Sequence, residues 1–141
     1  MSSITIQKNN ITKLATDAVV NAANTGLWHG SGVCGYIFRD AGVNEMSAAC
    51  NKIGHCDVGD AVITPGFNLP AKFVIHAVGP QYTDGKQGEP KLLYSAYKKS
   101  LLLAMENGLH SIGFPLISAG IYGYPLDGAW RKAIQACRDF L

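Results

Sequence analysis

The sequence has little net charge, few charged residues and no long apolar segment. Charged residues make up 16% of the 141 residues, and 12 Lys and Arg against 10 Asp and Glu leave a formal net charge of +2. This near-neutral balance argues against nucleic acid as a partner, because nucleic-acid-binding domains carry clustered basic charge. No apolar run reaches the length that spans a membrane, and the first residues lack the pattern of a secretory signal peptide. We therefore expect a cytoplasmic protein that has no membrane partner.

Cysteine is also sparse, and its spacing matches no metal site. The four cysteines are Cys34, Cys50, Cys56 and Cys137, and no two of them form a C-x-x-C pair. Structural zinc sites and disulfide frameworks are both built from closely patterned cysteines. The sequence therefore predicts a reduced protein that has no disulfide, no bound metal and no other cofactor.

Apolar residues and glycine, by contrast, are abundant. Hydrophobic residues make up 48% of the chain, which is enough to build the core of one domain over residues 1–141. The 16 glycines exceed their usual share, which is about 7% of residues. Many of them lie in or directly beside two stretches, at residues 23–32 and 117–124. We expect these two stretches to be loops with a special role.

The first glycine-rich stretch joins a predicted strand to a predicted helix. Residues 19–22 are mostly apolar and begin with two valines, which is typical of a buried strand, while Val33, Ile37 and Ala41 recur on one helix face. A strand, a glycine-rich loop and a helix start together make an anion site, because backbone N–H groups and the helix dipole face the ligand. No Lys or Arg occurs in residues 19–36, so backbone amides would have to hold the anion.

A glycine-rich loop alone is a weak signal, because glycines also serve ordinary connecting turns. Two features favour a binding role here. Asn21 and Asn24 stand at the end of the predicted strand, where open α/β sheets bind their ligands. A second loop of the same kind, at residues 117–124, follows another predicted strand. Asparagine is also common in turns for structural reasons, so a structural role for both side chains stays open at this point.

Four motifs along the chain resemble those of the macrodomain family, whose members bind ADP-ribose. They are DAVVNAAN at 17–24, GSGVCG at 30–35, VIHAVGP at 74–80 and FPLISAGIYGYP at 114–125. The resemblance runs from about residue 4 to residue 141. Four matches in the same order are far more specific than any one of them.

The fold that this resemblance implies is α/β, a three-layer α/β/α sandwich around a mixed, mostly parallel sheet. The apolar patterns predict strands at 4–7, 18–22, 60–65, 72–78 and 111–115, a single-turn segment at 11–14, and helices at 33–42, 44–53, 90–107 and 127–141. On the last helix we expect Trp130, Ala133, Ile134 and Cys137 to point inward. Macrodomains have a further strand after this helix, so we expect a C-terminally truncated domain or a sheet completed in another way, such as by a partner chain.

The resemblance also implies how ADP-ribose would be held. Asn10 and Ile11 would contact the adenine, and Asn10 stands where the family usually has Asp, which predicts a weaker adenine contact because Asn carries no charge. Asn24 and Tyr122 would contact the distal ribose, Asn21 would hold the loop, and backbone amides of both loops would surround the diphosphate. The residues predicted to line the ligand are Asn10, Ile11, Ala22, Asn24, Gly30, Ser31, Gly32, Val33, Cys34, Ser118, Ala119, Gly120, Ile121 and Tyr122.

At Cys34 the chain departs from many hydrolytic macrodomains, which carry Asp at this position and His where Phe38 stands. Alphaviral macrodomains also read Gly-Val-Cys and coronaviral ones Gly-Val-Ala, and members of both groups remove ADP-ribose from acidic side chains. The mechanism that this similarity implies is substrate assistance, in which a water held by a ligand phosphate attacks the distal ribose. Asn24, Gly32 and Tyr122 would then be the catalytic residues.

Several functional hypotheses stay open. The resemblance implies ADP-ribose or mono-ADP-ribosylated proteins as partners. The chain would be either a mono-ADP-ribosyl hydrolase and O-acetyl-ADP-ribose deacetylase, or a reader module without turnover. A nucleophilic Cys34 at a helix start is a less favoured alternative, because it needs a nearby base and His29 is the one histidine close in sequence. His76, on an apolar strand, is expected to be a core residue.

Overall fold

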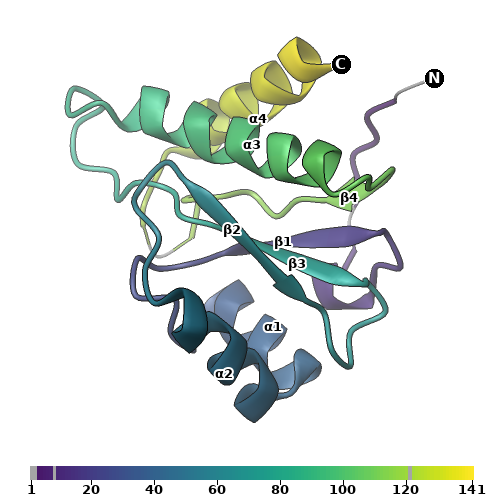
Figure 1. The fold of residues 1–141 in the computed structure, drawn as a ribbon. Coiled ribbons are helices and arrows are strands. Elements are labelled where there is room, and N and C mark those ends of the chain that lie inside the picture. The colour runs from purple at the N-terminus through teal and green to yellow at the C-terminus, as the bar shows by residue number, and fades with distance from the viewer. Residues whose placement is uncertain (1–2, 8, 121) are drawn as a thin grey trace.

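The sheet lies between two pairs of helices in a computed structural model that describes residues 3–7, 9–120 and 122–141. The strands are β1 (Ala18–Ala22), β2 (Ala61–Pro65), β3 (Phe73–Ala77) and β4 (Ile112–Gly113). The helices are α1 (Gly32–Ala41), α2 (Val43–Ile53), α3 (Glu89–Glu106) and α4 (Leu126–Phe140), and a single 3₁₀ turn, η1, covers Ile11–Lys13. Figure 1 shows α1 and α2 on one face of the sheet and α3 and α4 on the other. The predicted α/β sandwich is confirmed.

The order of the strands brings three chain segments together at one edge of the sheet. The order is β2-β3-β1-β4, with β1 parallel to both β3 and β4, and β2 antiparallel to β3. The sheet is therefore mixed and mostly parallel, as predicted. Because β1, β3 and β4 run the same way, their carboxyl ends meet at one edge, on the left in Figure 1. The segments 23–31, 78–88 and 114–125 leave the strands there.

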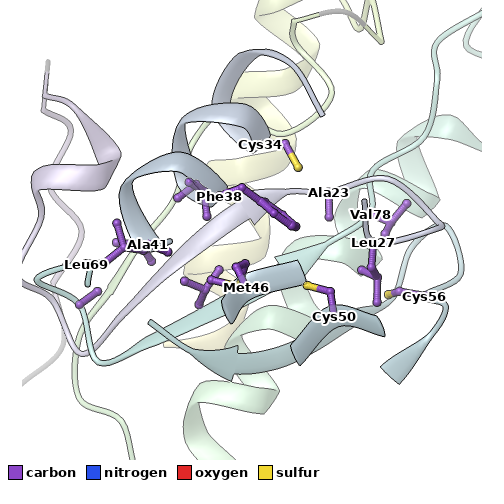
Figure 2. Packing of buried hydrophobic residues seen from close by; sticks show 14 residues of the cluster. Ala23, Leu27, Cys34, Phe38, Ala41, Met46, Cys50, Cys56, Leu69 and Val78 are labelled. Atoms are coloured by element: carbon purple, nitrogen blue, oxygen red, sulfur yellow. The ribbon is translucent and has the colours of Figure 1, made fainter. Parts of the chain in front are cut away.

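Alternation of side chains along the strands builds a separate core on each face of the sheet. Val19 and Val74 pack with α1 and α2, where Phe38 and Met46 are fully buried. Figure 2 shows this cluster, with Phe38 and Met46 at its centre and Cys34 at the start of α1. On the other face, Val20 and Ile75 pack against α3 and α4. The two central strands are thus covered on both sides, as their continuous apolar sequences require.

The predicted strand at 4–7 is wrong. Residues 3–7 form no strand, and both Ile4 and Ile6 are exposed. Alternating apolar residues favour a strand only where a neighbouring strand supplies hydrogen bonds. Among the described residues, β4 forms an edge of the sheet and has only β1 as a neighbour.

The predicted strand at 111–115 is shorter than expected, because β4 pairs with β1 only at Ile112 and Gly113. Pro115 cannot donate a backbone hydrogen bond, so it cannot extend the ladder. The remaining strand and helix predictions are confirmed to within a few residues at their ends.

The predicted inward face of α4 is confirmed only in part, because Ala133 packs against the core but the fully buried residues are others. The buried residues of this helix are Ala129 and Ala136, whereas Trp130 is 37% exposed. Small alanines let α4 approach α3 closely, so the helix turns its larger side chains away from α3. Trp130 and Ile134 instead border an open groove beside β4 and residues 3–7. None of the helices that the structure describes is long and apolar enough to cross a membrane.

Candidate functional site

The first predicted binding loop is folded by its own asparagine. The Trp28 N–H donates to Asn24 Oδ1 at 2.9 Å, and Asn24 Nδ2 donates back to the Trp28 carbonyl at 3.1 Å. The Leu27 N–H also donates to the Asn24 carbonyl at 3.1 Å. Asn24, predicted to contact the distal ribose, therefore has the turn-forming role that asparagine often takes.

The start of α1 leaves backbone N–H groups available at the end of this loop. Ser31 is the N-cap residue, but its side chain makes no capping hydrogen bond. The first N–H groups of a helix have no partner within the helix, so those of Gly32, Val33 and Cys34 are free to bind an anion or water. Gly35 allows a close approach here, because a Cβ at this residue would lie 2.6 Å from the Gly30 carbonyl oxygen.

The second predicted binding loop is fastened to the segment that follows β3. The Tyr82 N–H donates to the Tyr122 carbonyl at 2.8 Å, and the Tyr124 N–H donates to the Ser118 carbonyl at 2.9 Å. Ser118 is only 5% exposed and has a left-handed backbone with φ of 67°. Its hydroxyl has no hydrogen-bond partner among the described residues. Ile121, also predicted for this site, lies outside the residues that the structure describes.

The two loops lie near each other across the edge of the sheet. Burial raises the pKa of Tyr122, and repulsion from Cys34 raises it further. The loop that carries Tyr122 follows β4 and the loop that leads to Cys34 follows β1, and these two strands pair in parallel, so both loops leave the same edge of the sheet. The structure thus brings together two of the segments that the sequence predicts to bind one ligand.

Cys34 holds the first loop and has no base beside it. Its Sγ accepts a hydrogen bond from Asn21 Nδ2 at 3.4 Å, and its S–H donates to the Trp28 carbonyl at 3.4 Å. Within the described part of the chain, no histidine or carboxylate is a hydrogen-bond partner of this thiol. The His29 ring instead packs edge-on against Phe38, with ring centroids 5.5 Å apart. This geometry does not support a nucleophilic role, which requires a base within hydrogen-bond reach.

A buried row of hydrogen-bonded polar side chains extends from Cys34 into the core. Asn21 Nδ2 lies 3.1 Å from His76 Nδ1, and His76 Nε2 lies 2.9 Å from Thr64 Oγ1. Because the Asn21 amide nitrogen can only donate, His76 Nδ1 accepts, and the proton of the neutral ring is on Nε2. Burial lowers the pKa of His76 to about 4. As predicted, Asn21 and His76 are fully buried structural residues.

The predicted adenine contacts lie on η1, which packs beside α1. Asn10 caps this turn, and its Oδ1 accepts hydrogen bonds from the Thr12 N–H at 3.0 Å and the Thr12 hydroxyl at 2.9 Å. Asn10 is exposed and Ile11 is half-buried. The oxygen that was predicted to contact adenine is therefore already occupied by the cap.

A surface hollow that the sequence did not predict lies beside Tyr122. It has a volume of about 450 Å³ and is bordered by residues from the loop after β1, the segment after β3 and the start of α3. Glu89, which is 1% exposed, lies in its wall. The sequence contained one signal for it, a glutamate beside Pro90 at the first turn of a helix, where a carboxylate binds free N–H groups.

The Glu89 carboxylate organises the wall of this hollow. Its Oε2 accepts from the N–H groups of Thr83, Asp84 and Gly85 and from the Thr83 hydroxyl, at 2.9–3.2 Å, and its Oε1 accepts from the Gln87 N–H. These bonds, with the Thr83 N–H foremost, hold the pKa of Glu89 well below its usual range. The segment is thus wrapped around one buried charge. Among the described residues, no group of three His, Cys, Asp or Glu side chains could hold a metal ion.

Comparison with known proteins places the chain in a family. The model of the Macro domain matches residues 20–133. The chain belongs to the Macro domain family. It is 48% identical over 144 residues to a protein of Escherichia fergusonii named O-acetyl-ADP-ribose deacetylase, covering 99% of this macrodomain and 81% of that protein.

Solved macrodomains share its architecture. The Oceanobacillus iheyensis macrodomain with ADP matches with a TM-score of 0.88 and 38% identity, over 93% of this chain and 72% of that one. The Trypanosoma brucei macrodomain in complex with ADP-ribose matches with a TM-score of 0.86 and 43% identity, over 94% of this macrodomain and 54% of that chain. The comparisons therefore confirm both the macrodomain family and the macrodomain fold that the sequence motifs predict.

Proposed function

We propose that this macrodomain binds ADP-ribose between the loop at 23–31 and the loop at 117–124. The observation that carries the proposal is the meeting of these loops at the carboxyl ends of parallel strands, beside the uncapped start of α1. The ligands of the related solved structures, ADP and ADP-ribose, are consistent with such a site. A diphosphate suits it because it offers charge to the free N–H groups from both sides.

The roles of individual residues in this proposal follow from their positions. The N–H groups of residues 32–34 and 118–120 bind the diphosphate, and Ile11 contributes a backbone N–H to the adenine. Asn10 must give up its bonds to Thr12, or use its amide nitrogen, to contact the base. Asn24 and Tyr122 bind the distal ribose.

We further propose that the site hydrolyses esters of ADP-ribose. Relatives from Escherichia fergusonii, Citrobacter koseri and Citrobacter rodentium, 46–48% identical, are named O-acetyl-ADP-ribose deacetylase. With a glutamyl or aspartyl ester, a water bonds to the anomeric carbon of the distal ribose while the bond to the carboxylate oxygen breaks. The carboxylate leaves with the electron pair, and the water proton passes to a phosphate oxygen. Asn24 orients the ribose, and the N–H groups of the loops hold the phosphate charge.

A reader that binds ADP-ribose without turnover is the second candidate. The environment of Cys34 favours it, because the partners of this thiol are the Asn21 amide and the Trp28 carbonyl. Neither group can act as a general base for water. Under this hypothesis the same residues bind the ligand, but ADP-ribose esters stay intact in the site.

Calorimetric titration with ADP-ribose, ADP and AMP tests the binding proposal. ADP-ribose should bind more tightly than ADP, because ADP lacks the distal ribose. In Asn24→Ala, the loss of one hydrogen bond to the ribose should weaken ADP-ribose binding about tenfold more than ADP binding. Asn51→Ala, an exposed site on α2, is the matched control and should leave both affinities unchanged.

Two outcomes would count against these proposals. Equal loss of ADP and ADP-ribose affinity in Asn24→Ala would mean that this side chain acts only by holding Trp28. A turnover assay distinguishes the two candidate functions, because only an enzyme releases acetate from O-acetyl-ADP-ribose or ADP-ribose from a modified glutamate. Unchanged turnover in Asn24→Ala would contradict the proposed mechanism.

A further inference from the structure

The Asn24 side chain, which is proposed to contact the distal ribose, is held by the backbone of Trp28. Its Oδ1 accepts from the Trp28 N–H at 2.9 Å, and its Nδ2 donates to the Trp28 carbonyl at 3.1 Å. A Cβ at Gly30 would lie 3.6 Å from Asn24 Nδ2. The amide therefore lies beside the first loop, next to the residues assigned to the diphosphate.

The two hydrogen bonds to Trp28 use half of the capacity of the Asn24 amide. A primary amide has two hydrogens on its nitrogen and two lone pairs on its oxygen, and Trp28 takes one of each. The remaining hydrogen and lone pair suit ribose hydroxyls, which both accept and donate. Because the amide cannot turn over without breaking both bonds, Trp28 determines which end donates to the ribose and which end accepts.

Two neighbouring residues fix the Trp28 backbone in this position. Leu27, which is 2% exposed, anchors the loop in the core and has a left-handed φ of 58°. This conformation is uncommon for leucine, and burial of the side chain offsets its cost. The Cys34 S–H donates to the Trp28 carbonyl at 3.4 Å, so this carbonyl accepts two hydrogen bonds.

The Trp28 ring lies against the backbone of Gly26, in space that the Cβ of any other residue would need. Such a Cβ would lie 2.6 Å from Trp28 Cζ2 and 2.8 Å from Cδ2. Gly26 has no positive φ, so the ring, and not the backbone conformation, requires glycine here. Trp28 is 68% exposed. Its ring therefore adds little to the core, and its packing on Gly26 instead restricts the rotation of residue 28.

We infer that Trp28 is a positioning residue for the distal ribose. Its ring, packed on Gly26, holds the backbone N–H and C=O that orient the Asn24 amide toward the ribose hydroxyls. The inference rests on the proposed function and adds to it the residue on which discrimination between ADP-ribose and ADP depends.

Calorimetric titration of the full chain with ADP-ribose and ADP tests this role. Trp28→Ala should weaken ADP-ribose binding about fivefold and change the Kd of ADP by less than about twofold. In the Asn24→Ala background it should have no further effect, because the amide that it orients is gone. Trp28→Phe, whose flat ring can still lie on Gly26, should keep most of the affinity. Trp130→Ala, at the other tryptophan, is the control and should bind both ligands as the wild type does.

A second variant displaces the ring without removing it. Gly26→Ala places a Cβ in the space of the Trp28 ring and should weaken ADP-ribose binding about as much as Trp28→Ala. In the Trp28→Ala background, Gly26→Ala should have no further effect, because no ring is left to displace. This pair of variants separates the contact between the ring and Gly26 from a general loss of loop stability.

The outcomes separate this inference from the proposed function. If the wild type does not bind ADP-ribose, or if Asn24→Ala binds it equally well, the proposed ribose contact is wrong and the inference falls with it. If Asn24→Ala selectively weakens ADP-ribose binding but Trp28→Ala does not, the inference alone is overturned. Equal weakening of ADP and ADP-ribose in Trp28→Ala, or additive effects of Trp28→Ala and Asn24→Ala, would also overturn it.

Discussion

Lowering the pH from 8 to 5 should destabilise this macrodomain by about 2 kcal/mol through His76 alone. The pKa of His76 is lowered from 6.5 to about 4, because the ring is buried between the sheet and helices α1 and α2, beside Phe38 and Cys50. Between these two values the unfolded chain binds a proton that the folded protein does not. Stability is therefore full above pH 6.5 and is lost as the pH falls toward 4.

The structure indicates why no neighbour offsets this cost. The polar contacts of the ring are the Asn21 amide, the Thr64 hydroxyl and the Cys50 thiol, 3.9 Å from Nε2. Burial raises the pKa of Cys50 to about 11, so this thiol stays neutral across the pH range. A protonated ring would carry a hydrogen on Nδ1 that faces the Asn21 amide nitrogen, itself a donor, unless that amide turns its unpartnered Oδ1 toward the ring.

Urea unfolding at a series of pH values measures this effect. The unfolding free energy of the wild type should fall about 2 kcal/mol further between pH 8 and pH 5 than that of His76→Gln. His110→Gln, at an exposed position, should follow the wild type. Identical pH dependence in the wild type and His76→Gln, or an NMR titration of the His76 ring near pH 6.5, would refute the reasoning.

Three further predictions concern the loops. Cys34→Ala leaves an amide hydrogen of Asn21 without its sulfur acceptor, which should lower the unfolding free energy measured in urea by about 1–3 kcal/mol. Cys34→Ser, which keeps an acceptor, should retain most of the stability. An unchanged unfolding free energy in Cys34→Ala would contradict the loop-holding role. Glu89→Gln should lose stability at neutral pH and flatten the acid unfolding curve, because the carboxylate with the lowered pKa contributes above about pH 4.5 and its contribution is lost as the pH falls. The exposed Glu106→Gln is its control, and a wild-type acid curve in Glu89→Gln would count against the argument. Gly35→Ala places a Cβ against the Gly30 carbonyl oxygen and should displace the first loop, which should weaken ADP-ribose binding about tenfold in calorimetry. Wild-type affinity in this variant would mean that the loop can move without weakening ligand binding.

The sequence predicted the fold well where a local pattern and a motif agreed. The apolar segments of β1 and β3 are buried on both faces, so these strands could be predicted without knowing which strands pair with them. The prediction for residues 4–7 was wrong because a strand also requires a hydrogen-bonding neighbour. On α4 the prediction was right at Ala133 but missed Ala129 and Ala136, because the helix packs through alanines, which a search for large apolar residues overlooks.

The candidate site was predictable in part. The motifs located the two loops, but they did not indicate that Asn24 and Cys34 both hold the Trp28 carbonyl. Such a contact depends on the turn geometry of residues 24–28, which the residue types alone do not determine. The hollow was not predicted because its wall is assembled from segments near residues 25, 58, 81, 92 and 122. The position of Glu89 beside Pro90 indicates a helix start, but the residue types do not show that five donors of the preceding segment are brought to its carboxylate.

The parallel pairing of β1 has a consequence for the order of folding. Val20 pairs with Ile75, and Ala18 pairs with Ile112, so the central strand can find neither partner while only its own half of the chain has been synthesised. Contacts of such long sequence separation form slowly, because a large loop must close before they are made. The loops at 23–31 and 117–124 flank these pairings, so they come together late, after β4 has been synthesised. Ligand binding between these loops during synthesis would then stabilise only chains long enough to include β4 and the loop after it.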